Sequence, residues 1–339
     1  MKVIILAGGV GKRLWPISSQ SYPKQFLSLF DQKSLLQKTI DRFDNLDIVD
    51  HILVSTSVHY KELLKEQKPT SKKPLSFIYE PISRNTAPAI ALSVKYLEER
   101  LEISSEEPIL ILPSDHIIEP IEKFFGALKE VSMSLKGITT FGIKPRRAET
   151  GYGYIQVENS ECSIKSILQF IEKPPKRVAK AIYNKDGYLW NSGMFLFNCK
   201  IFWSAVKKHN ESLYNVFSQG YENSLSNFSD AENISFDHAI MEKVDNSFCI
   251  SLDVAWSDIG SWDSLYDILD KDSNQNVKVG NIVDLDTKNS LIIGQKKLVS
   301  TIGINNIIYI ETDDTIFLAK KGKSQDLKRL LDLIHVKNH

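Results

Sequence analysis

Residues 3–16 read Val-Ile-Ile-Leu-Ala-Gly-Gly-Val-Gly-Lys-Arg-Leu-Trp-Pro, an apolar run that ends at three glycines between positions 8 and 11. The run from Val3 to Ala7 has the length and composition of a buried strand. Glycines directly after a first strand let the backbone turn tightly and approach a ligand closely. Their amides can form a nest for phosphate oxygens. The stretch therefore predicts the opening strand of an α/β sheet, followed by an anion-binding loop.

Up to about residue 270, short apolar runs alternate with longer segments that have helical spacing. The runs cover residues 3–7, 51–55, 75–79, 109–113 and 138–143. Between them, apolar residues recur every three to four positions, as in Ala91, Val94 and Leu97. Strands that alternate with helices indicate βαβ units and a parallel sheet. The predicted fold class is α/β, with a Rossmann-like mixed but mostly parallel sheet flanked by helices.

The pattern changes after about residue 270. Residues 271–278 are polar and are predicted to form a linker. Five short β-like runs follow at 282–285, 291–293, 298–302, 307–310 and 315–319, and a final helix is expected over 325–336. We therefore expect two domains, residues 1–270 and a small β-rich domain of residues 271–339.

Composition excludes several classes of protein. A chain of 339 residues corresponds to about two domains. Its 42 basic and 42 acidic residues give zero formal net charge, which argues against nucleic acid or an anionic membrane as partner. No run approaches the roughly 20 apolar residues that span a bilayer. Cys162, Cys199 and Cys249 lie far apart, which argues against a disulfide framework or a zinc site. A cytoplasmic location is expected.

The glycine-rich loop has three interpretations from its residues alone. A phosphate-binding Walker A loop needs an earlier glycine where Leu6 stands, and Ser or Thr where Arg13 stands. A dinucleotide fingerprint fits Gly9 and Gly11 but has Leu14 in place of the third glycine. The glycines could also form a bare turn. The added Arg13, Pro16 and Lys24 favour a phosphate-binding loop of a different kind.

Residues 8–16 (Gly-Gly-x-Gly-x-Arg-Leu-x-Pro), with Pro23-Lys24 downstream, resemble the signature of sugar-nucleotide pyrophosphorylases. Further blocks follow in order: EPISRNTAPAI (80–90), LPSDH (112–116), ETGYGYI (149–155), FIEKP (170–174), GYLWNSGMFLF (187–197) and WSDIGSW (256–262). The ordered set is similar to the mannose-1-phosphate guanylyltransferases over nearly the whole chain, in the short form without an isomerase domain. Lys12, Ser83 and Ala255 depart from the commoner pattern without removing a charged or metal-binding group.

The resemblance implies a fold of the nucleotidyltransferase type and a transfer reaction between GTP and mannose 1-phosphate. A phosphate oxygen of the sugar phosphate attacks the α-phosphorus, and pyrophosphate leaves. Since this nucleophile is already anionic, catalysis needs alignment and charge stabilisation rather than a side-chain nucleophile. The resemblance also implies Mg²⁺, or Mn²⁺, on Asp115 and Asp258. From the residues alone, each aspartate could instead cap a helix.

The resemblance assigns the remaining site residues. The implied catalytic cations are Arg13, Lys24 and Lys173. The implied nucleotide-binding residues are Leu6, Ala7, Gly8, Gly9, Gly11, Glu80, Asn85 and Ser114. The implied sugar-binding residues are Gly153, Glu172 and Asn191. Glu80 suits guanine because a carboxylate accepts from both its N1–H and its 2-amino group. The alternatives are a loop acid for Glu80 and a surface ion pair for Glu172 and Lys173.

Other functions stay open at this point. The acceptor could be another sugar 1-phosphate, such as a manno-heptose. A non-catalytic homologue that binds sugar nucleotides could keep the fold without turnover, although Arg13, Lys24, Asp115, Lys173 and Asp258 are all retained. A nicotinamide-dependent dehydrogenase would leave both aspartate blocks unexplained. The resemblance also leads us to expect a homodimer.

Overall fold

The structure is a computed structural model and describes residues 1–9, 12–29 and 31–337. It contains two compact units. We call residues 1–8, 36–114 and 118–254 the sheet unit, and residues 9–35, 115–117 and 255–339 the C-terminal unit. This division follows spatial contacts and not one cut in the sequence. The boundary expected between residues 270 and 271 stays a prediction.

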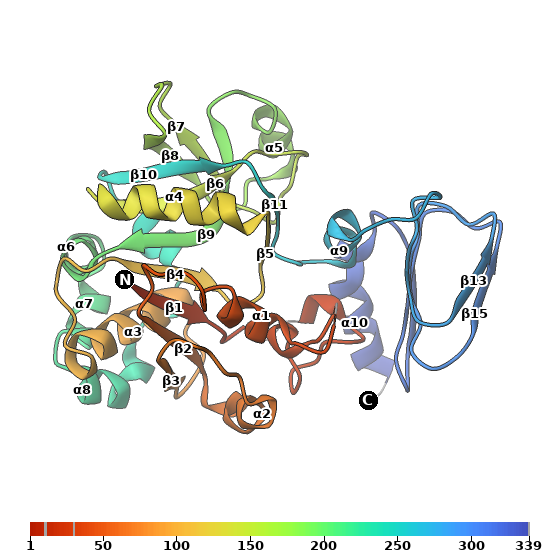
Figure 1. Cartoon of the computed structure of the whole chain (residues 1–339), viewed down its shortest axis with the longest axis horizontal. Coiled ribbons are helices and arrows are strands. Elements are labelled where there is room, and N and C mark those ends of the chain that lie inside the picture. Colours follow the sequence, from red (N-terminus) through yellow and green to blue (C-terminus); the bar gives the residue numbers. More distant parts are fainter. Residues whose placement is uncertain (10–11, 30, 338–339) are drawn as a thin grey trace. The chain divides into compact units, whose positions relative to one another are not determined.

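The sheet unit is built on a nine-stranded sheet with the order β3-β2-β1-β4-β9-β6-β10-β8-β7 (Figure 1). Its strands are β1 (Lys2–Leu6), β2 (His51–Ser57), β3 (Leu75–Glu80), β4 (Ile109–Pro113), β6 (Ile138–Ile143), β7 (Tyr154–Val157), β8 (Ile164–Ile171), β9 (Tyr188–Phe197) and β10 (Ser247–Leu252). The pairings make β8 and β9 run opposite to the other strands. The prediction of a mixed, mostly parallel sheet is confirmed.

The order β3-β2-β1-β4 brings the ends of two strands from distant parts of the sequence together. β1 pairs in parallel with β2 on one side and with β4 on the other, and Leu6 lies opposite Pro113. Ligands of open α/β sheets bind beyond the carboxyl ends of the strands, where the strand order reverses. Gly8 follows β1 by two residues, and Asp115 follows β4 by two residues. The sheet therefore ends at two of the predicted site motifs.

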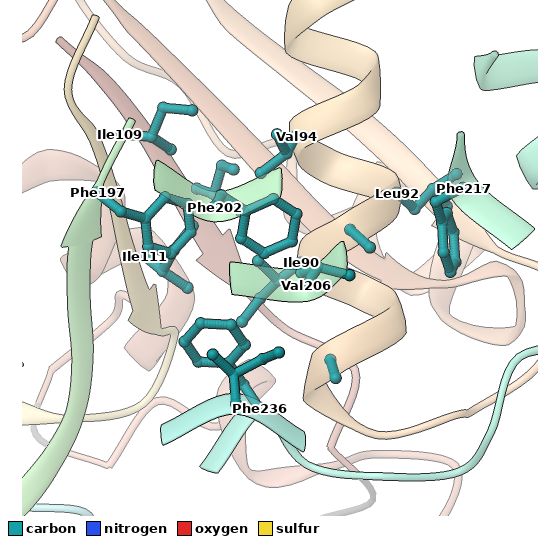
Figure 2. Close-up of a cluster of buried hydrophobic side chains, with 14 of the residues drawn as sticks. Ile90, Leu92, Val94, Ile109, Ile111, Phe197, Phe202, Val206, Phe217 and Phe236 are labelled. Carbon is teal, nitrogen blue, oxygen red and sulfur yellow. The ribbon is translucent and has the colours of Figure 1, made fainter. Parts of the chain in front are cut away.

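Helices flank this sheet and bury its apolar side chains. They are α1 (Leu35–Asp41), α2 (Lys61–Gln67), α3 (Thr86–Arg100), α4 (Ile121–Met133), α5 (Lys176–Ile182), α6 (Cys199–His209), α7 (Glu211–Phe217) and α8 (Tyr221–Ser226). Figure 2 shows Ile90 and Val94 of α3 facing Ile111 of β4 and Phe202 of α6. The apolar spacing predicted for α3 therefore faces the core of this unit.

The C-terminal unit contains short strands that coil between two sheets. They are β12 (Val277–Val279), β13 (Ile282–Leu285), β14 (Leu291–Ile293), β15 (Val299–Ile302), β16 (Ile307–Glu311) and β17 (Ile316–Lys320). Strands β12, β14 and β16 pair in parallel in one sheet, β13 pairs in parallel with β15 in the other, and β17 closes the first sheet antiparallel to β16. The unit also holds α9 (Trp262–Ile268) and α10 (Leu327–Lys337). The predicted β-rich region ending in a helix is confirmed.

One sequence prediction in this unit is wrong in part. The polar linker expected over residues 271–278 ends inside β12, where Val277 is buried and pairs with Leu291. Lys278 beside it is exposed and bonds Asp284. The segment looks polar because only one of its faces is buried, and pairing with a later strand makes it a strand.

The core of the C-terminal unit joins both ends of the sequence. Leu14 and Leu27, which follow the glycine-rich loop, pack in one cluster with Trp262 of α9, Ile308 of β16 and Phe317 of β17. The segment that carries Arg13 and Lys24 is thus held by C-terminal side chains. The short strands β5 (Ile117–Glu119) and β11 (Ala255–Ser257) lie in the segments that pass between the units. Within the described part of the chain, no helix has the length and apolar character needed to cross a bilayer.

Candidate functional site

Lys24 is the centre of a cluster in the C-terminal unit. It lies in a short 3₁₀ helix (Lys24–Phe26), and only 9% of the residue is exposed. Its Nζ lies 2.8 Å from Asp115 Oδ2. The same ammonium donates to the main-chain oxygen of Asp258, and to that of Ile259 at 3.3 Å. Three sequence motifs, predicted to belong to one site, therefore meet at this lysine.

Asp115 is held in its ionised form. Burial alone would raise the pKa of its carboxyl, but the Lys24 ammonium and the neighbouring His116 outweigh burial and lower the pKa below its ordinary value. The ring of His116 lies edge-on to Trp256, with ring centres 5.2 Å apart. Asp115 is therefore an anion beside a cation at neutral pH.

Asp258 lies in a tightly constrained loop. Its Oδ1 accepts from the Gly260 N–H at 2.8 Å, and a Cβ on Gly260 would stand 2.6 Å from Asp258 Oδ2. Ile259 between them has a φ of 44°, a left-handed value that a β-branched residue rarely adopts. Such strain costs on the order of 1–3 kcal/mol and occurs mainly at functional sites. The constraints fix the Asp258 side chain and the carbonyl that faces Lys24.

The structure excludes helix capping as the role of either aspartate. The N-cap of α9 is Ser261, which forms a reciprocal capping box with Ser264. Asp115 precedes the short strand β5 and no helix. Neither carboxylate is therefore used to cap a helix. In the described ranges, no three His, Cys, Asp or Glu side chains gather at one point. Two carboxylate ligands, completed by substrate phosphates and water, suit Mg²⁺.

The glycine-rich loop is described only in part. Gln25 Nε2 donates to the main-chain oxygen of Gly9 at 2.9 Å. Among the described residues, no heavy atom lies within 4 Å of a Cβ built on Gly9, so this backbone faces open space. The Arg13 side chain is exposed. The predicted Gly11 lies outside the described residues, and so does the side chain of Lys12.

Glu80 is a buried acid in the sheet unit, at the end of β3. It is 4% exposed, and its Oε1 accepts from the Ser55 hydroxyl at 2.8 Å. Burial raises the pKa of Glu80 to about 7, although the Ser55 hydrogen bond lowers it. A Cβ on Gly8 would stand 3.4 Å from Glu80 Oε1. Glu80 is therefore buried against the glycine backbone and is not an ordinary loop acid.

Four other residues predicted for the nucleotide lie in this unit, at the ends of strands or at the start of α3: Leu6, Ala7, Asn85 and Ser114. Asn85 caps α3 by accepting from the Thr86 N–H and has a strained φ of 67°. Ala7 pairs with β2 through its N–H, which donates to the Ser55 carbonyl at 2.7 Å. Ser114 is 2% exposed, and its N–H donates to the Leu6 carbonyl at 3.0 Å.

The predicted sugar-binding residues also lie together in the sheet unit. A Cβ on Gly153 would stand 2.6 Å from Glu172 Oε2 and 3.4 Å from Asn191 Cβ. Gly153 is therefore required to leave room for the Glu172 carboxylate. Glu172 pairs with the ammonium of Lys173, whose φ is 43°. The Glu172 side chain is 6% exposed and that of Lys173 is 55% exposed, so this is not a simple surface pair.

Sequence reasoning missed one residue of this cluster. Asp237 accepts from Asn191 Nδ2 at 2.8 Å. Burial, and next the Glu172 carboxylate, raise the pKa of Asp237 to about 6, against the lowering effects of Lys173 and the Asn191 hydrogen bond. It stands in the stretch Ser235-Phe236-Asp237-His238, which has no motif-like spacing. The only sequence signal for Asp237 is that an acidic residue directly follows an aromatic residue.

Comparisons with known proteins show what the whole chain is similar to. The family model described as "Nucleotidyl transferase" matches residues 2–275, and "MannoseP isomerase/GMP-like beta-helix domain" matches residues 280–333. A mannose-1-phosphate guanylyltransferase from Escherichia coli is 34% identical over 99% of this chain and 76% of its own length. The alginate biosynthesis protein AlgA from Pseudomonas fluorescens is 35% identical over 98% of this chain and 71% of its own. A solved structure described as a mannose-1-phosphate geranyltransferase from Thermus thermophilus superposes with a TM-score of 0.88 at 25% identity, over 98% of both chains.

Proposed function

The chain belongs to the nucleotidyl transferase family and, within it, to the mannose-1-phosphate guanylyltransferases, and from this premise we propose that it converts GTP and mannose 1-phosphate into GDP-mannose and pyrophosphate. A phosphate oxygen of mannose 1-phosphate forms a bond to the α-phosphorus of GTP. The bond from that phosphorus to the oxygen bridging the β-phosphorus breaks, and its electrons leave with pyrophosphate. The observation that carries the proposal is the meeting of Lys24 with Asp115 and the Asp258 loop.

Charge stabilisation by basic side chains is the first part of the proposed mechanism. Attack at the α-phosphorus increases negative charge on its oxygens and on the leaving pyrophosphate. Arg13 and Lys24 neutralise the triphosphate, and the open backbone at Gly9 offers amide donors to it. Lys173 binds the phosphate of the sugar.

We propose Mg²⁺, or Mn²⁺, as the cofactor, with Asp115 and Asp258 as its protein ligands. Their donor set of two carboxylates, one of them held ionised by Lys24, supports this assignment. The bound cation supplies a Lewis acid that offsets phosphate charge. Lys24 meanwhile keeps the Asp115 carboxylate and the Asp258 backbone in place.

Recognition of guanine is proposed for Glu80, with Asn85 later in the same sequence block. An ionised Glu80 accepts from the guanine N1–H and 2-amino groups. Its buried position supports selectivity for guanine. Another base that carries a carbonyl oxygen where guanine has the 2-amino group would leave the buried carboxylate unpaired. Glu172 and Asn191 are proposed to bind sugar hydroxyls next to Gly153.

A homodimer is also proposed, and the C-terminal unit supplies its support. Val283, Leu285 and Ile302 project from β13 and β15 and are 59%, 59% and 74% exposed. Leu285 and Ile302 are register partners, so these side chains are neighbours on one face. A second copy of the chain would cover this apolar surface. Light scattering of the wild type and of Leu285→Lys tests the dimer. The cytoplasmic location expected from the sequence remains a proposal.

The test of the proposed function is pyrophosphate release from GTP, measured with and without mannose 1-phosphate and with product identification by mass spectrometry. We expect release only when mannose 1-phosphate is present, and a product with the mass of GDP-mannose. A panel of other sugar 1-phosphates, including a manno-heptose 1-phosphate, measures the preference. Binding of both substrates without any release would instead identify a non-catalytic homologue.

A further inference from the structure

The carboxamide of Asn191 has a fixed orientation. Its Oδ1 accepts from the Gly193 N–H at 3.1 Å. The Thr140 hydroxyl lies 3.1 Å from the same oxygen and shares its one hydrogen with the Met194 carbonyl, 2.9 Å away. A backbone N–H can only donate, so the contact with Gly193 settles which end of the amide is oxygen. Its Nδ2 donates one hydrogen to Asp237 Oδ1 at 2.8 Å. The second N–H of Nδ2 has no partner among the described residues, so it remains for a ligand.

Asp237 supplies the complementary acceptor beside that N–H. A carboxylate has about four acceptor positions, and the Asn191 amide uses one of them. Asp237 is partly accessible, whereas Asn191 is 8% exposed. One donor and one acceptor therefore stand side by side on linked side chains. A hydroxyl group matches this pair, since it can donate to the carboxylate and accept from the amide at once.

The backbone at Asp237 is anchored on both sides. Phe236 is 1% exposed and packs against Phe195, with ring centres 5.0 Å apart. It also packs against Phe202, with ring centres 6.2 Å apart, and both of these residues are labelled in Figure 2. Its N–H donates to the Thr86 hydroxyl at 2.8 Å. Asp237 then begins a π-helix, Asp237–Met241, a conformation that is frequent at functional sites. The backbone that carries Asp237 is thus held by the packing of Phe236 and by its hydrogen bond to Thr86.

The charges around Asp237 suit a neutral polyol next to a phosphate. The Glu172 carboxylate and the Lys173 ammonium are the charged groups that act on it. The two carboxylates repel each other, and hydroxyl donors relieve that repulsion. Lys173 offers the positive charge that a phosphate on the same ligand needs.

We propose that Asp237 and Asn191 together bind one hydroxyl of the sugar 1-phosphate, which donates to Asp237 and accepts from the remaining N–H of Asn191. Asp237 is then a specificity-determining residue. The inference rests on the proposed function, because it names a contact to the acceptor substrate of that reaction.

The experiment measures kcat/KM for the wild type and for Asp237→Asn with GTP and a panel of acceptors. The panel is mannose 1-phosphate and its four analogues that each lack one hydroxyl, at carbon 2, 3, 4 or 6. Loss of a charged hydrogen-bond acceptor should lower kcat/KM for mannose 1-phosphate about 10- to 100-fold through the KM for the sugar. For one analogue only, the kcat/KM values of the wild type and of Asp237→Asn should agree within about threefold. That analogue lacks the hydroxyl that binds Asp237, so the substitution removes no contact to it. The KM for GTP should not change.

If Asp237→Asn lowered kcat/KM equally for all five sugar phosphates, Asp237 would have a merely structural role and the inference would be overturned. An unchanged kcat/KM for all five would overturn it as well. Asp245→Asn is the matched control, since Asp245 is an exposed acid of the same unit and pairs with Lys208. Inactive wild-type protein with mannose 1-phosphate would contradict the proposed function instead. If the wild type then uses another sugar 1-phosphate, the deoxy analogues of that sugar replace the panel.

A second measurement needs only the wild type, in case Asp237→Asn does not fold. The ratio of kcat/KM between mannose 1-phosphate and the discriminated analogue should shrink as pH is lowered through about 6, because protonated Asp237 loses its acceptor character. Titration of the substrate phosphate cancels in this ratio, since both acceptors carry the same group. A ratio that stays constant between pH 5 and pH 8, or equal rates for all five acceptors, would contradict the inference.

Discussion

Trp262 donates its indole N–H to the main-chain oxygen of Trp15 at 2.9 Å, across 247 positions of the sequence. The bond joins the predicted WSDIGSW block to the glycine-rich block within the C-terminal unit. Phe317 of β17 packs edge-on against the Trp15 ring, with centres 6.0 Å apart. The loop that carries Arg13 and Lys24 is therefore positioned by C-terminal side chains.

Replacing Trp262 by Phe should reduce both stability and turnover. The change removes one buried hydrogen bond, so the free energy of unfolding should fall by about 1 kcal/mol. Because the bond also restrains the loop with Arg13, kcat should fall severalfold. Trp203→Phe is the matched control: Trp203 donates to Glu98 at 2.9 Å in the sheet unit. It should lower stability similarly with kcat unchanged. Equal kcat values in the two variants would show that Trp262 does not position the loop for catalysis.

Replacing Glu80 by Gln should weaken the preference for GTP over other nucleoside triphosphates. Since the pKa of Glu80 is raised to about 7, its acceptor form is lost as pH falls below about 7. The KM of the wild type for GTP should rise between pH 8 and pH 6, and this rise should be smaller in Glu80→Gln. Comparison of the two proteins removes the titration of GTP itself. Glu311→Gln, which changes an acid that is also 4% exposed, is the control and should keep the preference. If Glu80→Gln kept the preference for GTP, residues other than Glu80 would have to recognise the base.

The same substitution should stabilise the protein at alkaline pH. A carboxyl whose folded pKa is raised favours the folded state in its protonated form, and this advantage is lost as pH rises from about 4.5 to about 7. The ionised Glu80 then opposes folding at pH 8. Denaturant unfolding of Glu80→Gln at pH 8 should give a gain on the order of 1–3 kcal/mol, and no gain at pH 4.5. A gain of equal size at both pH values would contradict the burial argument.

Replacing Asp115 or Asp258 by Ala should lower kcat at least about 100-fold while the protein stays folded, because each removes a carboxylate proposed to hold the divalent cation. Chelation with EDTA should abolish wild-type turnover, and Mg²⁺ or Mn²⁺ should restore it. Asp313→Ala is the control, since Asp313 is an exposed acid that pairs with Lys296. Circular dichroism checks the fold. Full activity of either variant in Mg²⁺ would remove the metal assignment.

Replacing Lys173 by Ala should raise the KM for mannose 1-phosphate about tenfold or more and change the KM for GTP much less. The reason is that its ammonium, 55% exposed and placed beside Glu172, is proposed to bind the sugar phosphate. Lys176→Ala removes an exposed charge three positions away and should leave both KM values unchanged. Equal effects of Lys173→Ala on both substrates would count against its role.

Local signals in the sequence carried most of the fold. The runs at 3–7 and 109–113 became β1 and β4, since four or five consecutive apolar residues bounded by Gly, Pro or Ser match a strand covered on both faces. One exception was β12, where Val277 becomes part of a strand only through Leu291. Strands β7, β8, β9 and β10 of the large sheet were not among the predicted runs either. Residue types and their order also carried the family. The family can be recognised from a glycine after a strand and from single Asp, Lys and Glu residues within fixed blocks. This recognition does not require knowing which residues lie next to them in the folded protein.

Relationships between distant side chains could be decided only by the tertiary structure. The sequence by itself determined an α/β sheet, a β-rich end and the set of charged residues at the motifs. The fold decided that Lys24 bonds the carbonyl of Asp258, 234 positions away, and that Leu14 and Leu27 pack with C-terminal strands. It also decided that Asp237, with no motif around it, accepts from Asn191. The physical reason is that periodicity reports which face of an element is apolar, whereas hydrogen bonding and burial depend on which elements the whole chain brings together.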